Sequence, residues 1–299
     1  MIEKYYDGAI EQVAAGLGTV EKNHLLVRYS GQFSVENLND TKQLEKNEDI
    51  FVQVHEFETG EITCAYEPYL TTICDGFRRY MTGTFEEFME TCDVYYLHRP
   101  VLLGYFNQDN TGREEIILLD EVAYEQERML AALERMLCAI ADRHPVLFVL
   151  NRFQLASKST MQLTARFLKC ENCNIGLVLG VSDIQAMPEF LVPDWEMLYE
   201  TLDDGSKIYH IGNSGRKKEE TIDDEKYVDY GSEKVYRKLQ NMVEFLDFDQ
   251  AAYYLETIER KIKFDNLLVD DAARFRMWLL FVKVSILRQD IPTVSYTHL

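Results

Sequence analysis

The sequence lacks long apolar runs and is poor in basic residues. None of its hydrophobic segments approaches the ~18 residues of a membrane-spanning helix, and the opening stretch MIEKYYDGAIEQ has no signal-peptide core. Lys and Arg total 31 against 51 Asp and Glu, which gives a formal net charge of −20. Because binding to nucleic acid and to anionic membranes depends largely on basic side chains, we expect a cytoplasmic protein that binds neither directly.

The sequence also lacks a phosphate-binding motif of the form G-x-x-x-x-G-K-[ST]. Such a loop needs glycines, so that backbone N–H groups reach the phosphates, and a Lys for the β- and γ-phosphates. His24–Tyr29 (HLLVRY) is a candidate first strand, and the SGQFS segment at 30–34 that follows it has one glycine and no adjacent Lys. Gly16 and Gly18 precede the strand, and we interpret them as the end of an opening helix.

Cysteines are few and scattered. The chain has six, at Cys64, Cys74, Cys92, Cys138, Cys170 and Cys173. In a reducing cytoplasm we expect core thiols rather than disulfides. Cys170 and Cys173 form a single C-x₂-C pair, and a zinc site would need two more ligands. We therefore predict no metal site, with zinc as the less favoured alternative.

What the sequence does contain is an alternation of strands and helices. Val146–Leu150 is an unbroken apolar run of strand length, typical of the middle of a sheet covered on both faces. Further strands are expected at Ile50–Phe57, Ile175–Val181 and Ser206–Ile211, and helices after Pro68, at Val122–Arg143 and around Ser159–Leu168. Residues 1–214 are thus predicted to be an α/β domain with a mainly parallel sheet covered by helices on both faces. Periodicity does not assign Phe85–Glu121.

The rest of the chain changes to helices only. We interpret 215–231 as a charged linker and 232–291 as three amphipathic helices whose spacing resembles that of helix-pair repeats. Two such repeats bury a solenoid core poorly, since arrays usually need about three. We expect the natural protein to be longer, and 292–299 (PTVSYTHL) to be a possible non-native tail.

Several segments match one family in order and spacing. They are YEPYLTTICDGF after the second strand, then PVLFVLNRFQLASKST, then IGLVLGVSD. From about Ile50 to Asp183 the chain resembles the nucleotide-binding domain of STAND-type AAA+ ATPases, signal-transduction NTPases with C-terminal repeats. Gln154, Leu155, Ala156 and Ser159 fall on the segment that trails the family's Walker B strand, and FDQAAYYLETI is similar to the second helix of a tetratricopeptide repeat.

The resemblance implies a nucleotide site, and the chain departs from it at the decisive positions. The positions that correspond to the site are Ser30, Gly31, Gln32, Asn151, Arg152, Ser182 and Asp183. Asn151 and Arg152 stand where the family has the acids that manage Mg²⁺. Asn carries no charge, and Arg places a cation where the metal ion would be. We therefore predict a degenerate site with no catalytic residue and no metal ligand. Binding of ATP or ADP without hydrolysis is the alternative to an empty site.

Three functions remain as hypotheses. The favoured one is a regulatory or scaffold protein that does not hydrolyse nucleotide and binds a protein partner, with a second copy of itself as the alternative, through its helical repeats. The alternative is an active signal-transduction switch ATPase with a highly divergent P-loop. An unrelated α/β enzyme comes third, because neither Cys138 with His144 nor His55 with Glu56 forms a recognisable catalytic group. Asp120 and Glu121 are interpreted as a helix cap rather than displaced Walker B acids.

Overall fold

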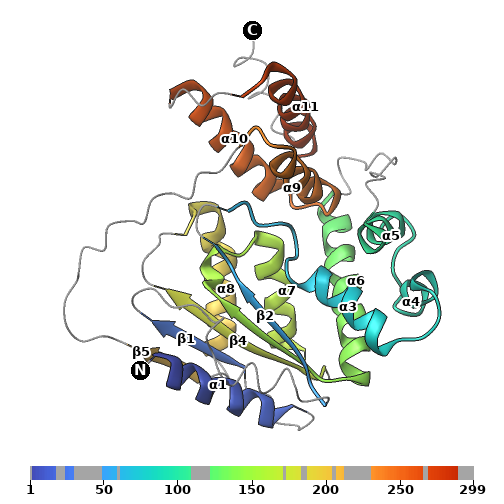
Figure 1. Cartoon of the computed structure of the whole chain (residues 1–299), viewed down its shortest axis with the longest axis vertical. Coiled ribbons are helices and arrows are strands. Elements are labelled where there is room, and N and C mark those ends of the chain that lie inside the picture. Colours follow the sequence, from blue (N-terminus) through green and yellow to red (C-terminus); the bar gives the residue numbers. More distant parts are fainter. Residues whose placement is uncertain are drawn as a thin grey trace.

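The computed structural model describes residues 2–17, 24–29, 49–58, 61–108, 122–170, 173–182, 187–203, 207–211, 230–264 and 269–288. Its α/β part contains the helices α1 (Ile2–Gly16), α3 (Tyr69–Tyr80), α4 (Phe85–Thr91), α5 (Arg99–Asn107), α6 (Val122–Arg143), α7 (Lys158–Lys169) and α8 (Val192–Asp203). Short 3₁₀ turns lie at Phe153–Leu155 and Glu189–Leu191. Three more helices follow: α9 (Glu233–Glu244), α10 (Phe248–Phe264) and α11 (Asp271–Leu287) (Figure 1).

A five-stranded sheet forms the centre of the α/β part. The strands are β1 (Leu25–Tyr29), β2 (Phe51–Glu56), β3 (Val146–Asn151), β4 (Ile175–Ser182) and β5 (Lys207–Ile211), in the spatial order β2-β3-β4-β1-β5. All four pairings are parallel. Every residue of β3 and β4 is buried, as expected for apolar strands covered on both faces. The prediction of an α/β domain with a parallel sheet is confirmed.

Alternate side chains of the strands face two separate hydrophobic clusters. On one face, Ile10 and Val13 of α1 pack with Leu25, Val27 and Val149. On the other face, α3, α6 and α7 cover Phe148 and its neighbours in a larger cluster. Helix α6 has the bounds predicted from its apolar stripe, because Met129, Leu133, Met136 and Ile140 repeat at helical spacing and are fully buried.

The region that periodicity left unassigned, 85–121, contains two short helices in its described part. Thr84 begins α4 with a capping box, since its hydroxyl accepts from the Glu87 N–H and the Glu87 carboxylate accepts from the Thr84 N–H. Helix α5 follows His98. Asp120 and Glu121 lie outside the described residues, as do 292–299 and all of the predicted linker except 230–231.

The helices α9, α10 and α11 pack on one another and against one end of the α/β part (Figure 1). The amide of Asn241 accepts from the Ala65 N–H at 3.2 Å, and Gln126 donates to the carbonyl of Leu246 at 2.7 Å. Phe245 packs edge-on against Tyr66 and Tyr105. The helical segment is thus joined to the α/β part by buried contacts. Within the described ranges, no helix has the length and apolar character needed to cross a membrane.

Candidate functional site at the carboxyl edge of the sheet

The strand order defines where a ligand site would lie. The chain leaves β1 toward the β2 edge of the sheet, returns through β3 to β4, and then crosses β1 to reach β5. In open parallel sheets, ligands bind beyond the carboxyl ends of the strands where connections leave in opposite directions. In this sheet that point lies between β1 and β4, at the paired residues Tyr29 and Ser182.

Tyr29 and Asn151 occupy this edge together. The Tyr29 hydroxyl donates to Asn151 Oδ1 at 2.7 Å, and both side chains are buried. Burial raises the pKa of Tyr29 to about 12, and the positive charge of Arg152 and the bond to Asn151 offset only part of that rise. The phenol is therefore neutral at physiological pH, and the amide of Asn151 serves as a hydrogen-bond acceptor inside the protein.

Arg152 directs its charge to a neighbouring acid. Its Nη2 lies 3.3 Å from Glu56 Oε1, and Glu56 is the strand partner of Asn151 in the β2–β3 register. Arg152 has a left-handed backbone (φ 54°, ψ 41°), which lets the chain turn sharply out of β3. The cation and the nearest described carboxylate at this edge thus neutralise each other.

Gln154 closes the space between the ends of β3 and β4. Its Nε2 donates to the Ser182 carbonyl at 3.1 Å, and its Oε1 accepts from the Ser182 N–H at 3.3 Å. Both residues are buried. These two hydrogen bonds from one side-chain amide hold the carboxyl ends of β3 and β4 together.

At the N-terminus of α7, which follows this edge, three N–H groups have partners from within the protein. Ser157 Oγ accepts from the Thr160 N–H at 3.2 Å, Asp247 Oδ2 from the Ser159 N–H at 3.1 Å, and Gln250 Oε1 from the Lys158 N–H at 3.3 Å. Helix N-termini attract anions because these N–H groups have no partner within the helix. Here the anion is Asp247, which belongs to the helical segment.

The structure brings together part of the predicted site. Asn151, Arg152 and Ser182 lie at one edge of the sheet. Ser30, Gly31, Gln32 and Asp183 fall outside the described residues. Sequence reasoning missed the role of Tyr29, Gln154 and Asp247 at this edge. Two signals were available in the sequence: Tyr29 is a polar aromatic residue at the end of an apolar strand, and Asp247 is an acid between two predicted helices.

The remaining alternatives from the sequence have structural roles. His144 stacks on Tyr80 with ring centroids 4.1 Å apart. His55 packs edge-on against Phe57, and burial lowers the pKa of this imidazole, so it is neutral near pH 7. Trp195 is partly buried and packs against the core.

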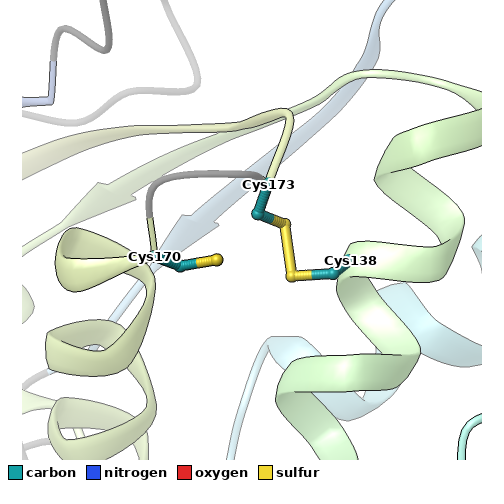
Figure 2. A group of neighbouring side chains, drawn as sticks. All are labelled: Cys138, Cys170 and Cys173. Carbon is teal, nitrogen blue, oxygen red and sulfur yellow. A yellow bond between two sulfur atoms is a disulfide. The ribbon is translucent and has the colours of Figure 1, made fainter.

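The prediction of separate core thiols was wrong for two cysteines. Cys138 of α6 and Cys173, which lies just before β4, form a disulfide across 35 residues of sequence. Cys170 lies beside them with its sulfur directed toward the pair (Figure 2). The error arose because spacing along the chain does not show that the ends of α6 and α7 meet. Cys64, Cys74 and Cys92 are free.

Two cavities lie away from the carboxyl edge. One of ≈ 560 Å³ is lined by α3, α5 and α9, and includes Asp75, Arg78 and Arg237. The other is a groove of ≈ 270 Å³ between α10 and α11, with Leu255, Ile258, Met277 and Phe281 in its lining. Neither contains a residue of the predicted nucleotide site.

The chain matches no model of a known protein family and no curated protein.

Proposed function

We propose that this chain is a regulatory or scaffold protein whose α/β domain does not hydrolyse nucleotide and whose helices bind a protein partner. The hydrogen bond from Tyr29 to the buried amide of Asn151 carries this proposal. At the end of β3, an NTPase needs a carboxylate free to hold hydrated Mg²⁺. This chain has a neutral side chain there, and that side chain is already used inside the protein.

The charges around Asn151 support the same conclusion. Glu56 is an acid on the neighbouring strand, and it pairs with Arg152. A divalent cation at this edge would meet the guanidinium and would have to compete with it for the carboxylate. Positioning Mg²⁺ beside a triphosphate would therefore require breaking an internal ion pair as well as the Tyr29–Asn151 bond.

The groove between α10 and α11 supports partner binding. Helix α11, which forms one wall of the groove, exposes large apolar side chains: Phe275 is 58% exposed, Leu279 48% and Ile286 43%. Phe275 and Trp278 stack with ring centroids 6.1 Å apart on the lining of the groove. Clustered exposed apolar residues mark interaction surfaces. An amphipathic helix laid in the groove fits this shape, and the net charge of −20 favours a basic partner.

Calorimetric titration of the full-length protein with ATP and ADP, each with Mg²⁺, tests the first half of the proposal. We expect no binding in the micromolar range and no release of phosphate. The matched variant Arg152→Ala removes the cation but keeps Asn151, and we expect it to remain inactive. Micromolar ATP binding with turnover by the unmodified protein would establish the switch ATPase instead.

Photo-crosslinking tests the second half. A photoreactive residue at Phe275 or Leu279 should capture the same partner, and one at the exposed Tyr96, on the α/β part, should not. Purified partner should then bind the unmodified chain, and Trp278→Asp should weaken that binding. Equal capture from all three positions would reject the groove as the binding surface.

A further inference from the structure

Three sulfur atoms converge at the amino-terminal edge of the sheet, opposite the candidate nucleotide edge. Cys138 comes from α6, Cys170 directly follows α7, and Cys173 precedes β4. The three Sγ atoms all lie within 4.8 Å of one another. Figure 2 shows the Cys170 sulfur pointing toward the bonded pair. A disulfide uses two of these sulfurs and leaves the third unexplained.

The spacing of the sulfurs suits a metal ion. With Zn–S bonds of 2.3 Å, tetrahedral ligands lie about 3.8 Å apart. Three sulfurs within 4.8 Å reach that separation through small side-chain movements once the Cys138–Cys173 bond is reduced. Thiolates are soft ligands that favour Zn²⁺, and three protein ligands with one open position is a known zinc arrangement.

The cluster lies at the carboxyl end of α7, whose last turn also carries Arg166 and Lys169. Cys170 is the C-terminal cap of α7, and its N–H donates to the Phe167 carbonyl. The carboxyl end of a helix carries partial negative charge, which attracts cations. Cys138 and Cys170 are partly exposed, so a metal ion can reach the cluster from solvent.

We propose that Cys138, Cys170 and Cys173 form a thiophilic metal site that binds one Zn²⁺ when reduced, with water or a small ligand in the fourth position. The Cys138–Cys173 disulfide is the metal-free, oxidised form of the same site. In the oxidation, the two thiolates lose two electrons to a small-molecule disulfide. That disulfide breaks and leaves as two thiolates, which take up protons from water, while the Cys138–Cys173 bond forms and Zn²⁺ is released.

Metal titration of the reduced full-length protein tests the site. Zn²⁺ added against a chromophoric chelator should bind with a stoichiometry of one, and the oxidised protein should bind none. Cys170→Ser should lower the affinity on the order of tenfold or more, since even residues that only orient a metal ligand contribute that much. Cys64→Ser and Cys92→Ser, which alter cysteines outside the cluster, should leave the affinity unchanged.

The ultraviolet absorption of bound Cd²⁺ is a second measurement, and it does not depend on the stability of the variants. Its sulfur-to-metal absorption band grows with the number of bound thiolates, so the unmodified protein should give the intensity of three and Cys170→Ser that of two. Failure of the reduced protein to bind one equivalent of metal would overturn the proposal. Equal metal affinity in Cys170→Ser would also overturn it, because the cluster would then be a disulfide pair with an uninvolved neighbour.

Discussion

The Tyr29 hydroxyl donates a hydrogen bond to Asn151 Oδ1 at 2.7 Å and so joins the last residue of β1 to the last residue of β3. Between these strands lies β4. The bond therefore crosses a strand at the edge where an open parallel sheet would place its ligand. The side chains of Tyr29 and Asn151, which are 1% and 0% exposed, fill that position from inside the protein.

Tyr29→Phe tests the structural value of this bond. The substitution keeps the ring and removes the donor, which leaves a buried amide oxygen with one partner fewer. We expect a loss of unfolding free energy of about 1–3 kcal/mol, measured by urea denaturation. Tyr96→Phe is the matched control, since Tyr96 is exposed and should shift stability by less than about 0.5 kcal/mol. Equal midpoints for the two variants would contradict the structural role.

A second prediction concerns Asp247, which joins the two parts of the chain. Burial raises the pKa of Asp247 to about 6, despite the hydrogen bond from Ser159 and the positive charge of Lys158. Asp249 also faces it and raises the pKa further. A raised pKa means that the folded protein binds this proton more tightly than the unfolded chain. Its contribution to stability is thus fully present below about pH 4 and is lost as pH rises through about 6.

Thermal unfolding from pH 4 to 8 measures this contribution. Asp247→Asn keeps an acceptor near the Ser159 N–H and removes the titration. The unfolding free energy of the unmodified protein, relative to the variant, should fall by on the order of 2 kcal/mol between pH 4 and 7. Asp270→Asn is a control, because Asp270 also caps a helix. Parallel pH profiles for the unmodified protein and Asp247→Asn would exclude a proton held more tightly at Asp247 in the folded state.

Local pattern was sufficient to predict most elements of the fold. Apolar stripes placed α6 and the three C-terminal helices, and unbroken apolar runs placed β3 and β4, because burial of one helix face or of both strand faces leaves a periodic signal. The short helices α4 and α5 lack that signal. Their aromatic side chains pack on neighbours such as Phe77, so tertiary contacts define them.

The candidate site was less predictable for a physical reason. Asn151 and Arg152 could be placed at a strand end, but the sequence does not show which strands are neighbours. Tyr29 meets Asn151 across 122 residues only because of the strand order. The Cys138–Cys173 pair depends in the same way on how α6 and α7 pack. Contacts between distant segments leave no periodic trace in one sequence.

A third prediction concerns two buried side chains in close contact near the start of α6. His98 Nε2 lies 3.1 Å from Glu125 Oε2, and the two side chains are 0% and 3% exposed. Arg128 also contacts Glu125, and its guanidinium lies over the rings of Tyr95 and Tyr124. Glu125→Gln should cost about 1–3 kcal/mol of unfolding free energy, because it removes the buried carboxylate that contacts both His98 and Arg128.

Asp75→Asn provides the comparison for Glu125→Gln. Asp75 pairs with Arg78 at 3.3 Å, but these side chains are 38% and 46% exposed, and solvent screens such a pair. Urea denaturation should show a change of less than about 1 kcal/mol for Asp75→Asn. A similar small change for Glu125→Gln would mean that the buried pair does not stabilise the fold.

The last prediction contrasts two glycines that differ in the space around them. Gly176 of β4 lies beneath α1, and a Cβ added there would be 2.6 Å from Val13 Cγ1 and 3.2 Å from Leu147 Cδ1. Gly8 of α1 has no heavy atom within 4 Å of its added Cβ. Gly176→Ala should destabilise the protein by about 1–3 kcal/mol through overpacking. Gly8→Ala should stabilise it by about 0.5–1 kcal/mol, because alanine is the better helix former.

Urea denaturation of both variants, together with Gly176→Ala combined with Val13→Ala, separates packing from backbone effects. Removing the Val13 methyl groups makes room for the new Cβ, so the double variant should be more stable than the sum of the two single losses predicts. Additive losses would mean that α1 does not contact β4 at this point. Since α1 covers one face of the sheet through Ile10 and Val13, such a result would reject the described packing of that face.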